Sequence, residues 1–255
     1  MRDVMQQVLH GVRVAVVKIP GCAALVNQFL GWLARRQSSL SRKYLHDNGM
    51  KVHGLIYETL TQNGVSYFAD HGTLLGLIRD NGVIAHDKDM DFSIPPDESF
   101  ARVYAALSKK GFSILHGFML NDALEEMTLC YQGLSIDFFR CHRIGNDLGH
   151  YVFINDYAPK TGTLLRTWAH ERKRPPLAGL ETREFGANCP VKVSIPQNAV
   201  EYLTASYGNW QVPDSKTDFC SDKIPTQYRD IHEGCKFLNA NEVKEVLERA
   251  SLYEN

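Results

Sequence analysis

Long hydrophobic runs are missing from this 255-residue sequence. A membrane-spanning helix needs roughly 18 to 20 consecutive apolar residues. The most apolar stretch, near the N-terminus, is broken by Arg13, Lys18, Pro20, Asn27 and Gln28. It also lacks the short continuous apolar region and small-residue cleavage site of a secretory signal. We therefore expect no transmembrane anchor, and a cytoplasmic location.

Paired cysteines are missing as well. The six cysteines are scattered and no two form a Cys-x-x-Cys pair, which argues against both a disulfide framework and a zinc ribbon. His232 and Cys235, with Cys220 upstream, do have the spacing of zinc ligands. Isolated thiols in a reducing compartment remain the favoured interpretation.

The chain has no surplus of one charge. Its 28 Lys and Arg residues nearly balance 29 Asp and Glu residues, for a formal net charge of -1. Nucleic-acid-binding proteins usually show a basic surplus or stripe, so we expect no nucleic-acid partner. With 44% hydrophobic and 22% charged residues, the composition is that of an ordinary folded protein with one large domain or two small ones.

The N-terminal segment, residues 1–40, predicts two amphipathic helices, Val4 to Ile19 and Ala23 to Arg36. Apolar side chains beside arginines in the second helix suit a membrane interface (Leu30, Trp32, Arg35, Arg36). A helical hairpin packed on the rest of the protein is the favoured alternative. Peripheral membrane contact through this segment is therefore an open expectation.

Helical and strand patterns alternate over residues 41–255, without repeats or a low-complexity linker. The patterns predict an α+β fold. Expected helices cover residues 43–63, 74–80, 99–110 and 241–253, and expected strands cover 65–70, 84–94, 112–120, 126–131 and 134–140.

An acidic motif, His-Asp-Lys-Asp-Met-Asp at residues 86–91, lies in one predicted strand. Residues two apart in a strand share a face, so Asp87, Asp89 and Asp91 would project together while Met90 and Phe92 enter a core. Carboxylates this close raise one another's pKa unless a cation lies between them. The motif therefore indicates a divalent metal.

Two further features join this motif. Gly72-Thr73 follows a predicted strand and precedes a short helix, where a helix N-terminus can receive phosphate. Asp137 interrupts the apolar strand Leu-Ser-Ile-Asp-Phe-Phe and is costly there unless it is paired or metal-bound. A phosphate cradle with three carboxylates in this order predicts a two-metal phosphoryl-transfer site.

An EF-hand would also use Asp-x-Asp-x-Asp, but its loop needs glycine at the sixth position, where this chain has Phe92. Pro95 and Pro96 would also disrupt that loop. A calcium-binding module is therefore rejected.

The stretch ADHGTLLGLIRDNGVIAHDKDMDFSI resembles the core signature of the LicD/fukutin family, which belongs to the DNA polymerase β-type nucleotidyltransferase superfamily. The match covers residues 72–76, Arg79 and the three aspartates. It departs at His86, where the family usually has tryptophan, and at Lys88, where it usually has aspartate. A later stretch, VKVSIPQNAVEYLTASYGNWQVP, is similar to the family's downstream segment. The resemblance spans roughly residues 51–213.

The resemblance implies a nucleotidyltransferase-like mixed, mostly antiparallel sheet flanked by helices, with residues 41–255 as the catalytic domain. It implies transfer of phosphocholine, glycerol phosphate or ribitol phosphate from a CDP-linked donor to a glycan hydroxyl, as in polysaccharide or lipopolysaccharide modification of the cell envelope. A nucleotidyltransferase that moves a nucleotide from a triphosphate to a sugar, protein or RNA acceptor is the alternative. A degenerate binding protein is disfavoured, because all three expected carboxylates are present.

The same resemblance assigns roles to individual residues. Mg²⁺ or Mn²⁺ would be held by Asp89 and Asp91, and Asp137 would complete the metal site or accept the proton of the acceptor. Asp87 is expected as a third ligand or as a residue of the rim. The donor phosphates would contact Gly72, Thr73, Arg79 and Lys88.

Overall fold

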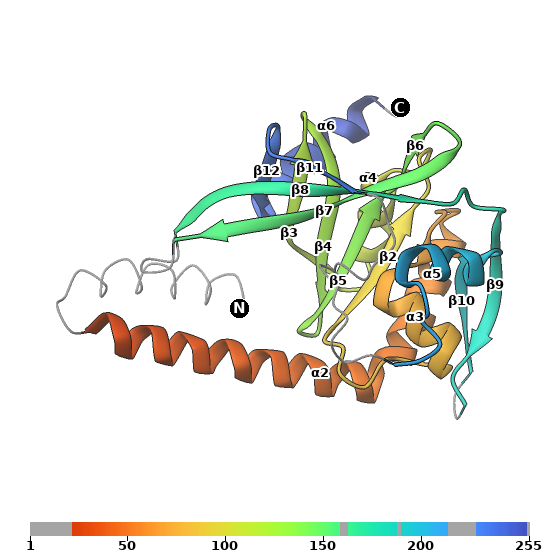
Figure 1. The fold of residues 1–255 in the computed structure, drawn as a ribbon, viewed down its shortest axis with the longest axis horizontal. Coiled ribbons are helices and arrows are strands. Elements are labelled where there is room, and N and C mark those ends of the chain that lie inside the picture. The colour runs from red at the N-terminus through yellow and green to blue at the C-terminus, as the bar shows by residue number, and fades with distance from the viewer. Residues whose placement is uncertain (1–21, 159–162, 188–189, 214–227, 254–255) are drawn as a thin grey trace.

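A six-stranded sheet lies at the centre of the computed structural model, which describes residues 22–158, 163–187, 190–213 and 228–253 (Figure 1). Its strand order is β1-β2-β5-β4-β3-β12, with β1 Phe68–Ala69, β2 Asp89–Ile94, β5 Leu134–Arg140, β4 Ala123–Tyr131, β3 Ser113–Leu120 and β12 Cys235–Asn239. Strands β2 and β5 are parallel, and all other neighbours are antiparallel. The predicted mixed, mostly antiparallel α+β fold is confirmed.

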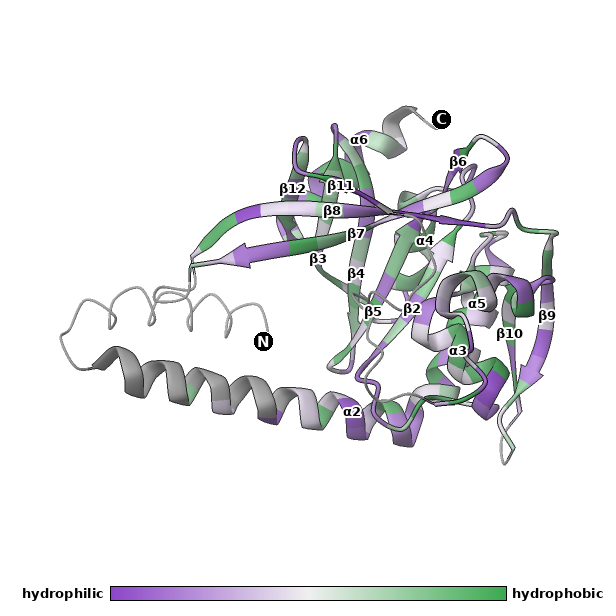
Figure 2. Ribbon diagram, in the orientation of Figure 1, coloured by the Kyte–Doolittle hydropathy of each residue, from purple (hydrophilic) through white to green (hydrophobic). Residues whose placement is uncertain are grey.

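A second, four-stranded sheet crosses the first one in Figure 1, and two of its strands form a long ribbon. Its order is β11-β8-β7-β6, with β11 Tyr228–Ile231, β8 Leu164–Arg174, β7 Asp147–Tyr157 and β6 His142–Ile144. A separate antiparallel pair is formed by β9 Leu180–Phe185 and β10 Val191–Pro196. Figure 2 shows that β9 carries a long hydrophilic stretch, whereas β5 is mostly hydrophobic.

The helices cover the edges and one face of these sheets. They are α2 Cys22–Gln62, α3 His71–Asp80, α4 Phe100–Ser108, α5 Ala199–Tyr207 and α6 Ala240–Tyr253. Helix α2 contacts β2, β5 and β10, α3 contacts β2 and α5, and α6 contacts β3, β4 and β12. Among the described residues, no helix is long and apolar enough to cross a membrane.

The parallel strands β2 and β5 divide the core from the polar side of the sheet. Met90 and Phe92 on β2 and Ile136 and Phe138 on β5 are fully buried, and the rings of Phe92 and Phe138 stack with their centroids 5.3 Å apart. Because side chains alternate along a strand, the intervening aspartates of both strands project from the opposite face. The alternation predicted from the acidic motif is present from residue 89 onward.

Helix α2 differs from the prediction. Two helices, at 23–36 and 43–63, were expected, but one helix runs without interruption from Cys22 to Gln62. The intervening Gln-Ser-Ser-Leu-Ser-Arg sequence has no proline or glycine to end a helix. Residue 40, the predicted boundary of the N-terminal segment, lies inside α2, and the division into domains stays a prediction. The helix predicted at 4–19 falls outside the described residues.

Several element starts also differ from the prediction: β1 begins at Phe68 rather than at Val65, and β4 begins at Ala123 rather than at Glu126. Helix α3 begins at His71 rather than at Leu74, because Asp70 caps it with a hydrogen bond from the His71 N–H. Strand β2 begins at Asp89, so Asp87 precedes the strand and owes its position to the preceding turn. The strands β6 to β9, β11 and β12 were not predicted.

Candidate active site

The first turn of α3 is joined to the acidic strand β2. The side chain of Thr73 accepts a hydrogen bond from the Asp91 N–H (2.8 Å), and the Asp70 N–H donates to the Asp91 carbonyl (3.0 Å). These two bonds fix the N-terminus of the helix beside the carboxylate of Asp91. The Gly-Thr motif and the acidic motif therefore form one structural unit.

Asp91 and Asp137 are direct neighbours across the parallel strands β2 and β5. On the other side of β5, Asp137 is opposite Thr128 of β4. Glu126 lies two residues before Thr128 in β4 and is therefore on the same face of the sheet. Three adjacent strands thus bring acidic side chains to one face. Two of these three positions, Asp91 and Asp137, were predicted from the sequence.

Gly72 lets the helix approach the carboxylates closely. A Cβ atom at this position would lie 3.1 Å from Asp87 Oδ2 and 3.7 Å from Asp91 Oδ2. Any larger side chain would press on one carboxylate and fill the space beside the other. The glycine therefore keeps a small volume open between the helix N-terminus and the two aspartates.

These groups line a cavity of about 440 Å³. Its acidic residues come from the turn before β2, from β2, from β4 and from β5 (Asp87, Asp89, Asp91, Glu126, Asp137). The strands β7 and β8 of the second sheet close it with Val152, Phe153 and Arg172. His71, His86 and Tyr207 are further polar side chains of the lining, so a ligand here would meet five acidic side chains and one guanidinium.

Crowding and burial make ionisation of these carboxyl groups unfavourable. Burial, together with the charges of Asp89, Asp137 and Asp87, raises the pKa of Asp91 well above its usual range. Burial also raises the pKa of Asp137 to about 7 and that of Asp87 to about 6, with Asp89 adding to both shifts. Such clustered, perturbed groups in a cavity are typical of a functional site.

Two other acidic residues share this environment. Burial raises the pKa of Asp89, although the charge of Lys88 opposes the shift. Glu126 is only 8% exposed, and burial and the charge of Asp137 raise its pKa well above the ordinary value. Without added positive charge, the cavity therefore resists full deprotonation.

The predicted cations Arg79 and Lys88 are not among the lining residues of this cavity, although their charges act on its carboxylates, Arg79 on Asp87 and Lys88 on Asp89 and Asp137. Arg79 makes two hydrogen bonds to its neighbour Asp80, of 2.8 and 2.7 Å, and Lys88 is exposed. Thr73 is buried and its hydroxyl is engaged with Asp91. Gly72 and the four predicted aspartates are brought together, whereas Thr73, Arg79 and Lys88 are not among the residues that line the cavity.

Several polar lining residues were not assigned from the sequence, His86 and Tyr207 among them. Glu126 and Arg172 lie in strands far from the acidic motif, and no local pattern distinguishes them from other charged strand residues. Arg172 is only 5% exposed, which is unusual for an arginine. His71 was noted beside the motif, but as a structural residue.

A buried network supports the helix N-terminus from behind. The carboxylate of Asp70 accepts hydrogen bonds from Ser93 (2.6 Å), from Tyr202 (3.1 Å) and from Arg174. Arg174 also donates to Nδ1 of His71 at 3.1 Å. Since a guanidinium cannot accept, this bond makes Nδ1 of His71 the acceptor, and burial lowers the pKa of His71 to about 3. The imidazole at the cavity wall is therefore neutral.

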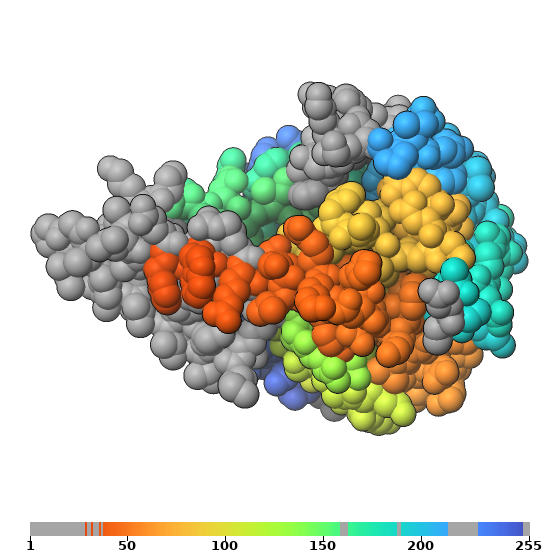
Figure 3. Space-filling model, turned by 90° about the horizontal axis from the view of Figure 1, so that it is seen from below, coloured from red at the N-terminus to blue at the C-terminus, as the bar shows by residue number. Residues whose placement is uncertain are grey.

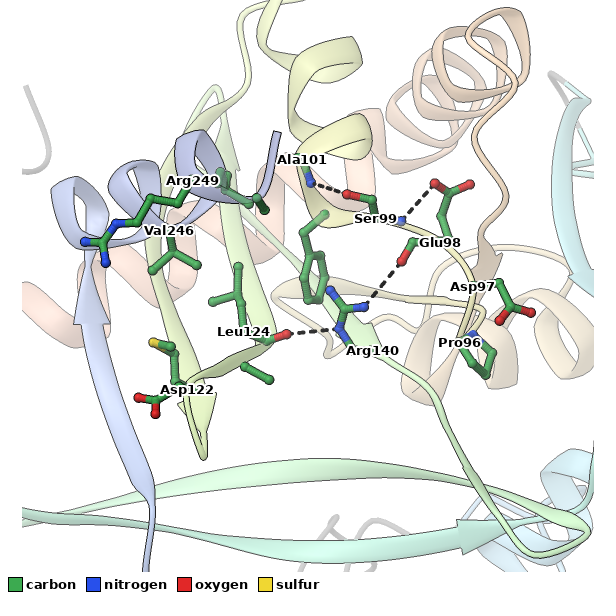
Figure 4. Close-up of a pocket in the computed structure, with 15 residues that line it drawn as sticks. Pro96, Asp97, Glu98, Ser99, Ala101, Asp122, Leu124, Arg140, Val246 and Arg249 are labelled. Atoms are coloured by element: carbon green, nitrogen blue, oxygen red, sulfur yellow. Dashed lines mark hydrogen bonds between the residues drawn. The ribbon is translucent and has the colours of Figure 1, made fainter. Parts of the chain in front are cut away.

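A larger pocket of about 730 Å³ lies elsewhere, between the start of α4, the β3–β4 turn and α6 (Figure 4). It shares no lining residue with the carboxylate cavity. The guanidinium of Arg140 in this pocket donates to the backbone carbonyls of Leu124 (3.1 Å) and Glu98 (3.4 Å). Two of its nitrogens are therefore engaged in hydrogen bonds to the backbone. We assign the candidate active site to the smaller cavity, because several acidic side chains with raised pKa values meet there.

A comparison with protein families matches the part of the chain that contains most of this cavity. The family model described as LicD/FKTN/FKRP, nucleotidyltransferase domain, matches residues 64–196, just over half of the chain. That range contains every acidic residue of the cavity and Arg172. It ends before α5 and starts after α2.

Three curated relatives are similar over part of the chain. Ribitol-5-phosphate transferase FKTN of Mus musculus is 28% identical over 179 residues, which is 69% of this chain and 36% of the relative. The Homo sapiens protein of the same name is 25% identical over 199 residues, or 73% of this chain and 40% of the relative. An uncharacterized protein of Rickettsia typhi is 34% identical over 62 residues, 24% of this chain and 20% of the relative. The match thus spans well under half the length of each of these relatives.

Proposed function

The chain belongs to the LicD/FKTN/FKRP nucleotidyltransferase family, and on this basis we propose that it transfers a phosphorylated alcohol from a CDP-linked donor to a glycan hydroxyl. The candidates are phosphocholine, glycerol phosphate and ribitol phosphate. Similarity to proteins named ribitol-5-phosphate transferase favours ribitol phosphate among the three. The observation that carries the proposal is the meeting of Asp89, Asp91 and Asp137 in one cavity beside the N-terminus of α3.

The donor set of this cavity fits a hard divalent cation such as Mg²⁺ or Mn²⁺. All its acidic ligands offer oxygen, which these ions prefer. Within the described residues, no group of three His, Cys, Asp or Glu side chains is already arranged to hold a metal ion. Magnesium is usually held by one or two carboxylates together with substrate phosphates rather than by a cage of protein ligands alone. The fit is therefore to a metal that is bound together with the donor.

Asp89 and Asp91 would hold this ion, with Asp137 and Asp87 as further ligands. When bound, the metal would neutralise the charge of the donor diphosphate and that of the leaving CMP. It would also relieve the crowding that raises the pKa of Asp91. The space that Gly72 leaves beside Asp87 and Asp91 is the position for donor oxygens.

The residues of the chain would hold the rest of the donor. The backbone N–H groups of Gly72 and Thr73 lie in the first turn of α3, where a helix offers no internal acceptors and attracts anions. Arg172 reaches the cavity from β8 and can bind phosphate oxygens with its planar fork. We assign Arg172 the role that the sequence suggested for Arg79 or Lys88.

The reaction would balance as follows. The acceptor hydroxyl oxygen attacks the phosphorus that carries the alcohol, and the bond from that phosphorus to the CMP oxygen breaks. CMP leaves with the electron pair. The hydroxyl proton passes to a carboxylate of the cavity, for which Asp137 is the candidate. Asp137 thus keeps its two proposed roles, ligand or proton acceptor.

A test compares CDP-ribitol, CDP-glycerol and CDP-choline as donors, with Mg²⁺ and an oligosaccharide acceptor. The expected result is metal-dependent release of CMP with the alcohol phosphate on the acceptor, strongest with CDP-ribitol. The family model is described as a nucleotidyltransferase domain, so nucleoside triphosphates are tested in parallel. Release of pyrophosphate, with the nucleotide on the acceptor, would instead support transfer of a nucleotide and overturn the proposal.

A further inference from the structure

Three large apolar side chains lie exposed on the N-terminal half of α2. Phe29, Trp32 and Leu40 are 55%, 47% and 54% exposed. With Arg36 they follow one another at intervals of three and four residues, so all four share one face of the helix. The rings of Phe29 and Trp32 stack with centroids 6.0 Å apart, and the Arg36 guanidinium lies 5.3 Å from the Trp32 ring centroid.

This face points away from the domain. The buried apolar residues of the same helix are Leu45, Val52, Ile56 and Leu60. At about 100° per residue, they lie about 120–200° around the helix from Leu40. Figure 3, seen from below, shows α2 on the outside of the molecule. The core of the domain therefore cannot cover the face formed by Phe29, Trp32, Arg36 and Leu40.

The positive charge of this part of α2 indicates what kind of partner would bind there. Residues 22–42 contain Arg35, Arg36 and Arg42 and no acidic residue, whereas the whole chain carries a net charge of -1. Arg36, which lies on the face described above, is exposed. A second copy docked through the same face would bring these positive charges together, which is unfavourable. An anionic partner with an apolar layer satisfies both the arginines and the exposed rings.

We propose that this face of α2, which we call the outer face, docks the protein on an anionic lipid bilayer. Phe29, Trp32 and Leu40 would enter the boundary between headgroups and acyl chains, where tryptophan is especially suited. Arg36, which lies on the same face, would attract the anionic headgroups. The proposal does not depend on the reaction proposed above, because none of these residues lines the carboxylate cavity.

The test is co-sedimentation of the full chain with vesicles of phosphatidylcholine, alone or mixed with phosphatidylglycerol. We expect sedimentation with the mixed vesicles only, and less at high salt. The variant Phe29→Ser/Trp32→Ser should bind at least about tenfold more weakly. Val200→Ser/Val212→Ser, which removes two residues that are 59% and 62% exposed elsewhere, is the matched control and should bind like the wild type.

A second measurement locates the contact. Brominated lipid should quench tryptophan fluorescence, and Trp32→Phe should abolish the quenching while the protein still sediments. Melting temperatures of all variants should stay unchanged, because these side chains are exposed. Equal sedimentation of wild type and Phe29→Ser/Trp32→Ser would overturn the proposal, and so would quenching that survives Trp32→Phe. A wild-type dimer that becomes monomeric in Phe29→Ser/Trp32→Ser, without vesicle binding, would assign the outer face to a second copy instead.

Discussion

Asp70 and Arg174, 104 positions apart in the chain, form an ion pair whose side chains are only 1% and 2% exposed. The pair joins the N-cap of α3 to the end of β8. Burial alone would raise the pKa of Asp70, but the charge of Arg174 holds it well below its usual range. The same guanidinium donates to Tyr202 of α5 at 2.8 Å and to His71. One arginine thus positions the helix N-terminus that lines the candidate active site.

Removing one partner of this pair should be strongly destabilising. Arg174→Met leaves the carboxylate of Asp70 buried without its counter-charge, and such changes cost about 3–5 kcal/mol. Urea unfolding of the metal-free protein measures this cost. The double variant Asp70→Asn/Arg174→Met should lose much less stability than the sum of the single variants, because no charge then remains unpaired. Additive losses would contradict the coupling.

Loss of a central carboxylate should abolish turnover without loss of fold. Asp91→Asn and Asp89→Asn keep the shape of the side chain but remove a charge that the proposed metal site needs. We expect turnover to fall by more than about 100-fold. The melting temperature of the metal-free protein should stay equal or rise, because repulsion is relieved. Asp97→Asn, at a position that is 85% exposed, is the matched control and should leave turnover unchanged. Near-normal turnover of Asp91→Asn at saturating Mg²⁺ would contradict the metal assignment.

The stabilising effect of Asp137→Asn should depend on pH in the absence of metal. The pKa of Asp137 is raised to about 7 in the folded protein, against about 4 in the unfolded chain. The folded state therefore binds this proton more tightly, and the stability that the bound proton gives is lost as the pH rises through the folded pKa. The variant Asp137→Asn has no proton to lose at this position, so it does not lose this stability. The melting temperature of the variant minus that of the wild type should therefore increase from about pH 5 to about pH 8.

Measuring the difference between variant and wild type is essential here. Burial lowers the pKa values of His53, His71 and His150, so these groups favour the unfolded state as the pH falls below about 6.5. Their contribution to the stability changes with pH in the opposite direction. It is nearly the same in the variant and the wild type, so it largely cancels when the two melting temperatures are subtracted. Added Mg²⁺ should raise the melting temperature of the wild type more at high pH, because metal binding needs deprotonated carboxylates. A difference independent of pH would show that Asp137 is not the titrating group.

The acidic motif and the Gly-Thr turn predicted the centre of the site because their chemistry is local. Alternation of apolar and acidic residues placed Asp89 and Asp91 on one face, and Asp137 was recognisable as a single charge in an apolar strand. The pairing of β2 with β5 then brought these residues together. Sequence periodicity also identified every strand of the central sheet from β1 to β5.

The remaining wall of the site could not be predicted for a physical reason. Arg172 and Arg174 lie in β8, a strand of the second sheet. The sequence of β8 is mostly polar and shows no clean alternation of apolar and polar side chains. Their burial depends on the second sheet crossing the first, which is a long-range event. Asp87 was assigned by strand parity, yet it lies before β2 and reaches the cavity through a turn. The capping role of Asp70, by contrast, was visible in principle, because aspartate is a preferred N-cap.

His53 in α2 should be replaceable by leucine with a gain in stability. The imidazole is 1% exposed, neither ring nitrogen has a hydrogen-bond partner, and the ring packs edge-on against Phe92 with centroids 5.5 Å apart. Unsatisfied buried polar atoms cost about 1–3 kcal/mol. His53→Leu should therefore raise the free energy of unfolding, and more at pH 5 than at pH 8, because burial lowers the pKa of His53 to about 3. A loss of stability at both pH values would show that the imidazole has a structural role.

Arg172 should matter more for donor binding than Arg79. Arg172 lines the cavity, whereas Arg79 is paired with Asp80 outside it. Arg172→Gln removes the charge and the planar fork, and it should raise the KM for the CDP-linked donor by about 10-fold or more. Arg172→Lys should recover part of this loss, because it restores the charge but not the bidentate geometry. Arg79→Gln is the matched control and should change KM by less than about threefold.

Because Arg172 is buried, its variants are first compared by melting temperature, and binding of CDP is then measured by calorimetry on folded protein. If Arg172→Gln weakens the affinity for CDP and Arg172→Lys partly restores it, Arg172 contacts phosphate. A purely structural role would not produce this pattern. The contact also predicts that the affinity lost in Arg172→Gln is larger for CDP than for cytidine, since only CDP carries the charges that the guanidinium would bind. Equal losses for CDP and cytidine would place Arg172 outside the phosphate site and return that role to the helix N-terminus alone.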